Sequence, residues 1–255
     1  MRRMRQSPPD SQSGQAAVEA ALTLPLTIFI ILGTLQFFLL LQARTLTEYA
    51  AFRAVRTGSV KHGDCEAMVH AAVASLLPTF ARTNSPASLG DAFAQHRDNR
   101  YQPGRDAGHD GAIVWIARER PLRGELRADE EESFDDPARY RQAADVMRLE
   151  ARIIFWYPMR IPFANWVLGR MFLAHWGLRE YSAADPLSPV HVATWSDKTT
   201  SPAMLDRAIG QEMLERASRE QYVFPLQASY TMRMMTPARS TLFRTQNCPL
   251  TPERL

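Results

Sequence analysis

Residues 20–41 read AALTLPLTIFIILGTLQFFLLL and contain no charged side chain. About 20 consecutive apolar residues span the hydrocarbon core of a bilayer as one α-helix. The uncharged Thr and Gln side chains are tolerable there, and Pro25 lies near enough to the start to kink the helix rather than break it. The stretch is apolar on every face, whereas a helix on the surface of a soluble core has a polar face. The sequence therefore predicts a single transmembrane helix over residues 20–41.

The residues around this span predict its orientation. Arg2, Arg3 and Arg5 precede it, which favours a cytoplasmic N-terminus. Arginines also follow the span, but long domains are translocated largely regardless of charge, so we expect the bulk of the chain in the periplasm. A cleavable secretory signal would have an apolar region of about 7–15 residues and a small-x-small cleavage site. Leu41-Gln42-Ala43 lacks the small first residue, so we expect a retained anchor in a bacterial inner membrane.

The composition of the remainder is that of an ordinary globular protein. The chain has 255 residues, 45% apolar and 22% charged, which is enough for one or two domains with a core. The formal net charge is +3, and residues 1–13 contribute +2 of it through three arginines and one aspartate. No Lys/Arg stripe interleaved with aromatic residues follows, so the sequence gives no case for nucleic-acid binding.

The sequence shows no signature of catalysis. It contains no G-x-S-x-G, H-E-x-x-H or phosphate-binding loop. The acidic stretch 127–140 lacks the alternating oxygen ligands and central glycine of a calcium loop, so we expect a solvated surface loop. We therefore predict no enzyme activity, no metal, no cofactor and no small-molecule substrate. The histidines are scattered: His62, His70, His96, His109, His175 and His191.

The two cysteines, Cys65 and Cys248, both follow the span and so lie on the same side of the membrane. In an oxidising compartment they could form a disulfide that closes a long loop. The alternative is two reduced or separately buried thiols, and the sequence leaves both readings open.

A charged residue marks the membrane edge of the apolar run. Glu19 ends the stretch Ser13-Gly14-Gln15-Ala16-Ala17-Val18-Glu19, and a carboxylate entering hydrocarbon costs a few kcal/mol and usually has a partner. After a basic leader, this arrangement resembles the class III (type IV-like) prepilins. In that family a prepilin peptidase cuts after the glycine, here between Gly14 and Gln15, and glutamate is the fifth mature residue, as Glu19 is here. The resemblance implies that Glu19 pairs with the new N-terminal amine during assembly.

The resemblance extends over residues 14–60, which look like the TadE-like segment of tight-adherence (Tad) pilus assembly proteins. The matching features are Gly14, Glu19, Leu24-Pro25, Gln36-Phe37 and the helix from Ala50 to Arg56. Major Tad pilins usually carry an aromatic residue after the glutamate and are far shorter, whereas this chain has Ala20. The resemblance therefore implies a minor pseudopilin. Its partners would be the lipid bilayer, prepilin peptidase, other pilins or pseudopilins and the Tad machinery.

Two other functions remain as alternatives. One is a membrane-anchored periplasmic binding or sensor domain without a filament role, and the other, less favoured, is a membrane-bound periplasmic enzyme. The expected division of the chain is a basic leader over residues 1–14, a TadE-like segment over 15–60 and a periplasmic α+β domain over 61–255.

Hydrophobic periodicity predicts the elements of that domain. The membrane helix continues as a helical stretch with Gly58 as a C-cap or bend, and a second helix runs from Asp64, its N-cap, to Leu77, where Pro78 closes it. We expect three antiparallel strands with helices on one face, hence an α+β fold. Residues 161–178 contain Asn165, Arg170 and His175 and are predicted to be a buried or membrane-facing helix, not a second span. The remaining expected elements are a short helix at Leu89–His96, strands at Ala112–Arg118, Val146–Tyr157, 186–195 and Val223–Met235, and a helix at 202–220.

Overall fold

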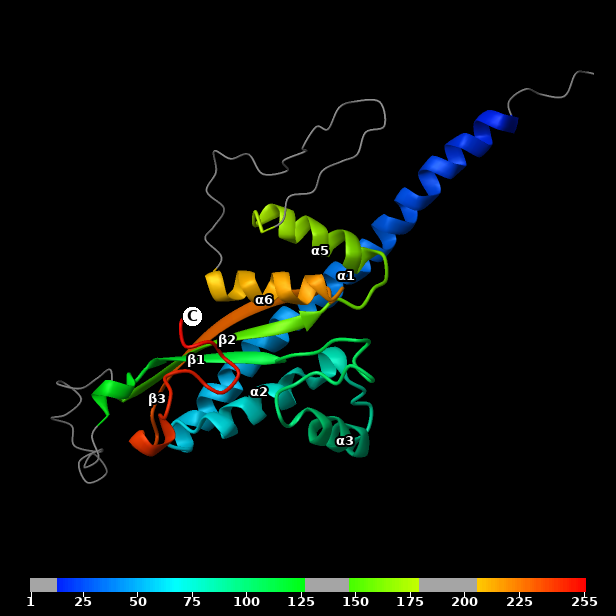
Figure 1. Cartoon of the computed structure of the whole chain (residues 1–255). Helices are drawn as coiled ribbons and strands as arrows, with labels where there is room; N and C mark the ends of the chain where they lie inside the picture. Colours follow the sequence, from blue (N-terminus) through cyan, green and yellow to red (C-terminus); the bar gives the residue numbers. More distant parts are fainter. Residues whose placement is uncertain (1–12, 127–146, 179–205) are drawn as a thin grey trace, which may run out of the picture.

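A single long helix dominates the computed structural model, which describes residues 13–126, 147–178 and 206–255. This helix, α1 (Ser13–Val60), is unbroken through Pro25. Its N-terminal half projects away from the rest of the molecule and its C-terminal half lies along a three-stranded sheet (Figure 1). The helix is long and apolar enough to cross a membrane, and only 11% of its most apolar 18-residue stretch is buried by protein. The fold is therefore a long N-terminal helix followed by an α+β domain, as the sequence predicts.

The elements after α1 include both helices and strands. The expected strands at 112–118, 146–157 and 223–235 and the expected helices at 64–77, 89–96 and 161–178 are all present, with ends shifted by a few residues. In chain order they are α2 (Cys65–Phe80), α3 (Pro86–His96), β1 (Val114–Arg120), the short 3-10 helix η1 (Arg123–Glu125), β2 (Arg148–Pro158), α5 (Ala164–His175), α6 (Arg207–Ser218), β3 (Val223–Arg233) and the 3-10 helix η2 (Ser240–Leu242).

The described strands form one antiparallel sheet in the order β1-β2-β3. The central strand β2 pairs with both neighbours, with Phe155 opposite Val114 on one side and Leu226 on the other. Its first half alternates between buried and more exposed residues, and its second half, from Ile153 on, is buried throughout. Successive side chains of a strand point to opposite faces, so this second half needs cover on both faces.

Helices accordingly pack on both faces of the sheet, and the expectation of helices on one face is wrong. On one face, the ring of Phe155 contacts Phe80 of α2, at 6.2 Å between centroids. On the other, the guanidinium of Arg216 in α6 lies 4.8 Å from the centre of the Trp156 ring. Figure 1 shows α1 and α2 on one side of the sheet and α6 on the other. The apolar run Ile153–Tyr157 is the physical reason, because it leaves neither face polar.

Two helix-ending predictions are wrong. Gly58 lies inside α1 as a close-contact position, because a Cβ there would come within 2.7 Å of side-chain atoms of Leu149 and Met68. Pro78 lies inside α2, which continues to Phe80 because the N–H of Ala81 still donates to the carbonyl of Leu77 at 2.8 Å. The predicted N-cap is confirmed: the Asp64 carboxylate accepts the N–H groups of Glu66 and Ala67.

The helix expected at 202–220 is α6, which begins at Arg207 and is capped by the side chain of Asp206. Residues 202–205, the acidic stretch 127–140 and the strand expected at 186–195 lie outside the described residues. The helix expected within 161–178 is α5, whose 12 residues are about 18 Å long. That length is too short for a hydrocarbon core of about 30 Å, so α5 is not a second span.

Candidate functional site

The first turns of α1 hold the residues that the sequence singles out. Gly14 and Gln15 lie in the first turn. Glu19 is exposed one turn further on, and it is the sole ionisable residue between Ser13 and Ala43. No described residue of the folded domain covers this end of the helix, since every described side chain from Ala16 to Ile28 is exposed. The carboxylate of Glu19 is therefore presented on a bare helix.

The polar groups of this bare segment are satisfied within the helix itself. The hydroxyl groups of Thr23 and Thr27 donate to the carbonyls four residues earlier, both at 2.9 Å, and Thr34 does the same at 2.7 Å. Such back-bonding hides a hydroxyl from its surroundings. Pro25 has no N–H to contribute, so it removes one helical hydrogen bond without breaking the helix. The segment is thus compatible with a hydrocarbon environment, in which polar groups must be satisfied internally.

The junction between the bare segment and the domain is polar and buried. Gln36 is 1% exposed, and its amide oxygen accepts the N–H of Ile161, at 2.9 Å, from the segment between β2 and α5. Ahead of it, Phe29 already contacts Phe163 ring edge to ring face, at 5.9 Å between centroids. The stretch from Ala16 to Leu35 therefore stands between the start of the helix and the first polar tie to the domain. At 1.5 Å per residue it is about 30 Å long, the thickness of a hydrocarbon core.

Beyond Gln36, α1 becomes part of the domain core. Its buried positions there are mostly small: Ala43, Ala50, Ala51 and Ala54 are at most 1% exposed. Small side chains let the helix backbone approach α2, β2 and β3 closely. Larger residues on the same helix, such as Tyr49, point outward. The helix and the domain therefore form one packed unit from Gln36 to Val60.

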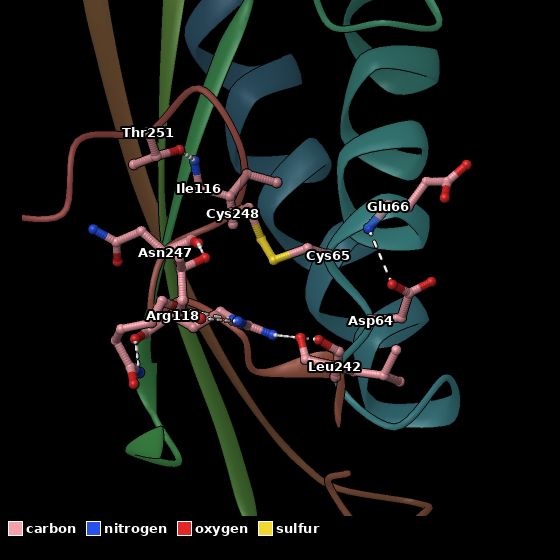
Figure 2. Close-up of a disulfide and its surroundings, with 12 residues drawn as sticks. Asp64, Cys65, Glu66, Ile116, Arg118, Leu242, Asn247, Cys248 and Thr251 are labelled. Carbon is pink, nitrogen blue, oxygen red and sulfur yellow. Dashed lines mark hydrogen bonds between the residues drawn. A yellow bond between two sulfur atoms is a disulfide. The ribbon is translucent and has the colours of Figure 1, made fainter. Parts of the chain in front are cut away.

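The far end of this unit is fastened by a disulfide and a buried arginine (Figure 2). Cys65, at the start of α2, is bonded to Cys248 near the C-terminus with the sulfur atoms 2.00 Å apart. Beside it, Arg118 of β1 is 1% exposed and donates to the carbonyls of Gly63, Leu242, Thr245 and Gln246. One side chain thus ties the α1–α2 turn to the C-terminal segment.

The surroundings of Arg118 explain a required glycine. Its guanidinium lies 3.7 Å from the centre of the Phe243 ring, and that ring packs against Gly63. Gly63 has φ of +79°, and a Cβ there would meet Phe243 at 2.5 Å, so only glycine fits. Burial lowers the pKa of Arg118 to about 10, which still leaves the guanidinium charged at neutral pH.

The C-terminal segment also covers the edge of the sheet at β1. The N–H of Cys248 donates to the carbonyl of Ile116 at 3.0 Å, and the N–H of Ile116 donates to the hydroxyl of Thr251 at 2.9 Å. An uncovered strand edge invites pairing with other chains. The disulfide therefore holds in place a strap, residues 234–255, that closes this edge.

A second buried arginine holds the opposite face of the sheet. Arg216 donates to the carbonyl of Ala112 and forms an ion pair with Glu212, both at 2.7 Å. Nearby, burial, and after it the positive charge of Arg216, lower the pKa of His109 to about 4. His109 is therefore neutral in the folded protein at physiological pH.

The structure places the predicted residues at opposite ends of α1. Gly14, Gln15 and Glu19 lie at its N-terminal tip, whereas Cys65 and the Cys248 bonded to it follow its C-terminal end. Sequence reasoning missed Arg118, although period-two alternation in the strand places it on the same inward face as Ile116, and it missed Arg216. It noted Gln36 without a partner, because the partner is a backbone N–H distant in sequence.

These features define a structural class: an α+β domain that continues an apolar helix long enough to cross a membrane. Among the described residues, one helix of membrane-spanning length and composition leads without a break into the core of an α+β domain, and no cluster of metal-ligating side chains is present.

A comparison with protein families identifies the N-terminal segment more closely. Residues 14–56 match the family described as TadE-like protein. The match confirms the resemblance seen in the sequence: this segment is TadE-like, which supports membrane anchoring and involvement in Tad pilus assembly. Searches of curated proteins and of solved structures found no match.

Proposed function

We propose that the protein is a minor pseudopilin of a Tad/Flp-type pilus or secretion assembly. The observation that carries this proposal is the division of α1 into a bare half that begins with Gly14, Gln15 and Glu19 and a half fixed in the domain. A bare apolar helix with one carboxylate near its start is suited to packing beside the same element of other subunits. The function is assembly, not catalysis.

The proposed topology follows from the same helix. The anchor lies in a bacterial inner membrane, with residues 1–14 as a cytoplasmic leader and the domain after the span in the periplasm. The disulfide between Cys65 and Cys248 supports this placement, because disulfides persist in oxidising compartments such as the periplasm. The proposed division at residue 60 coincides with the end of α1, and the described parts of residues 61–255 pack around the part of α1 that follows Gln36.

In the proposed maturation, prepilin peptidase cuts between Gly14 and Gln15 on the cytoplasmic face. The new amine of Gln15 lies about one helical turn from Glu19 in its own chain, and it pairs with the Glu19 carboxylate of a neighbouring subunit. An unpaired charge in an apolar bundle is costly, and pairing of the two charges relieves that cost and sets the register. The domain is carried along as one body, since Gln36 and the packed half of α1 join it to the helix.

Processing is tested by mass spectrometry of the N-terminus in cells with an active prepilin peptidase. The wild-type chain is expected to begin at Gln15, and Gly14→Ala is expected to retain the leader. Gly33→Ala is the matched control, because a Cβ at Gly33 meets nothing within 4 Å. A wild-type chain that keeps residues 1–14 in those cells would contradict the proposal and favour a permanently anchored binding or sensor domain.

The role of Glu19 is tested by the amount of processed protein that co-purifies with sheared pili or pseudopili. Glu19→Gln is expected to be cut normally and to be lost from the assembled fraction. Glu48→Gln is the control, because Glu48 is an exposed carboxylate of the same helix that pairs with Arg44 at its own surface, at 3.6 Å. Equal incorporation of both variants would refute the assembly role of Glu19.

A further inference from the structure

Helix α5 and its N-cap residue carry an exposed set of apolar and aromatic side chains, and the helix contacts α1. Phe163, Trp166 and Met171 are 49%, 40% and 52% exposed. The opposite face of α5 is used inside the domain, where Leu168 and Leu173 are buried. We call Phe163, Trp166, Arg170 and Met171 the α5 foot.

The rings of the foot form a ladder that starts on α1. Phe29 contacts Phe163 edge to face, and Phe163 is stacked on Trp166 at 6.5 Å between centroids and an interplanar angle of 17°. The guanidinium of Arg170 then lies 4.3 Å from the centre of the Trp166 ring. The ladder thus leads from the apolar span, through two aromatic rings, to a positive charge.

The level of this ladder along α1 decides what surrounds it. Phe29 lies six residues closer to the N-terminus than Leu35, hence about 9 Å further along the helix. If Ala16–Leu35 fills the hydrocarbon core, Phe29 lies inside it, and so does the ring of Phe163 that contacts Phe29. In Figure 1 the chain entering α5 lies further toward the N-terminal end of α1 than α2, α3 or the strands do.

We propose that the α5 foot is inserted into the periplasmic surface of the bilayer beside the span. Phe163 enters the acyl region, Trp166 lies at the level where aromatic belts occur, and Arg170 extends toward the headgroups. Phe163 has φ of +67°, a conformation unusual for a bulky residue, and its side chain is half exposed. Together with the hydrogen bond from Ile161 to Gln36, the foot holds the domain at a fixed orientation on the membrane.

This inference rests on the membrane anchoring in the proposed function and adds a second lipid contact to it. The bilayer is the favoured occupant because the exposed rings are continuous with the span itself and lie at its depth. A second copy of the chain would have to enter the same lipid-filled space to cover them. The experiment must therefore distinguish contact with a second copy of the chain from contact with lipid.

The test uses the full chain reconstituted into phosphatidylcholine–phosphatidylglycerol vesicles. The acyl chains are brominated either near the headgroup or near the chain end, and tryptophan fluorescence is measured. We expect strong quenching by bromines near the headgroup, and Trp166→Phe is expected to lose most of it. Trp176→Phe is the matched control: Trp176 lies at the other end of α5 and packs on Phe224, at 5.5 Å between centroids, so quenching should persist.

Equal quenching in the wild type and Trp166→Phe would overturn the proposal. So would Trp166 emission that responds to the protein-to-lipid ratio but not to bromine, because that result would place a second copy on the foot. Vesicle flotation separates this failure from that of the anchor. A chain that does not float with the vesicles lacks the anchor itself, whereas one that floats without Trp166-dependent quenching has an anchor and no foot.

Discussion

The two halves of α1 share one unbroken backbone but have opposite surroundings. From Ala16 to Leu35 the helix carries large apolar side chains that point outward, and from Gln36 to Val60 it is packed against α2 and the sheet. The first half has Leu, Ile and Phe where it is exposed. The second half also exposes Phe38 and Leu41, but its buried positions are mostly Ala.

The difference teaches that burial in lipid and burial in protein call for different residues. In lipid, large apolar side chains stabilise a helix because the hydrocarbon removes them from water, and they need not fit the shape of a fixed neighbour. A helix in a protein core must match the shape of its neighbours at near-crystalline density, so small residues mark the close approaches. Close packing against the domain begins around Gln36, whose buried amide oxygen accepts the N–H of Ile161.

The largest expected effect is a loss of domain stability when the disulfide is removed, and it concerns only the packed half of α1 and its domain. In Cys65→Ser with Cys248→Ser, loss of the bond across 183 residues should lower the free energy of unfolding of the domain by about 4–5 kcal/mol. Denaturant unfolding followed by tryptophan fluorescence in detergent checks this, and membrane insertion should be unchanged. Reduced wild-type protein should unfold with the double variant; if it unfolds with the oxidised wild type, the bond contributes nothing.

The next effect is a pH dependence confined to the packed half. The folded-state pKa of His109 is about 4, below its ordinary value of 6.5, so the unfolded chain binds a proton first as the pH falls. Stability from this group is complete above 6.5 and is lost between 6.5 and about 4, by roughly 1.4 kcal/mol per pH unit and about 3 kcal/mol in all. Thermal unfolding across this range should show it, and His109→Gln should flatten the profile. An unchanged profile in that variant would exclude His109 as its origin.

A matched pair of glycines compares the two halves directly. Gly58→Ala places a Cβ 2.7 Å from the side chains of Leu149 and Met68, so overpacking should cost about 1–3 kcal/mol. Gly33→Ala meets nothing within 4 Å and should leave the unfolding midpoint nearly unchanged. Equal effects at the two positions would show that the halves of α1 are not distinguished by their packing.

The smallest expected effect concerns the junction. Gln36→Leu leaves the N–H of Ile161 without its acceptor at a partly buried position, which should cost about 1–2 kcal/mol. The orientation of the domain should also loosen, measurable as faster hydrogen exchange at Ile161 and at the start of α5. Gln42→Leu, on the exposed side of the same helix, is the control. Protected exchange in Gln36→Leu would mean that the ring contacts alone hold the junction.

Much of the architecture was predictable from local patterns. The uncharged run predicted the long apolar helix, the Asp64 cap predicted the start of α2, and apolar runs predicted the three strands. The errors came from residues whose role depends on distant neighbours. Gly58 and Pro78 are residue types typical of helix ends. Gly58 nevertheless lies inside α1, where it packs closely against Leu149, and α2 continues past Pro78 with one further helical hydrogen bond, from the N–H of Ala81 to the carbonyl of Leu77.

The candidate site divides in the same way. The sequence alone determined the apolar helix, its basic leader and the position of Glu19, because these depend on residue type and spacing along one chain. Only the tertiary structure decided where the uncovered part of α1 gives way to the part packed in the domain, which partners Gln36 and Arg118 bind, and that Phe163 lies against Phe29. Such contacts depend on the packing of segments far apart in sequence, and hydrophobic periodicity carries no information about which distant surface will meet which.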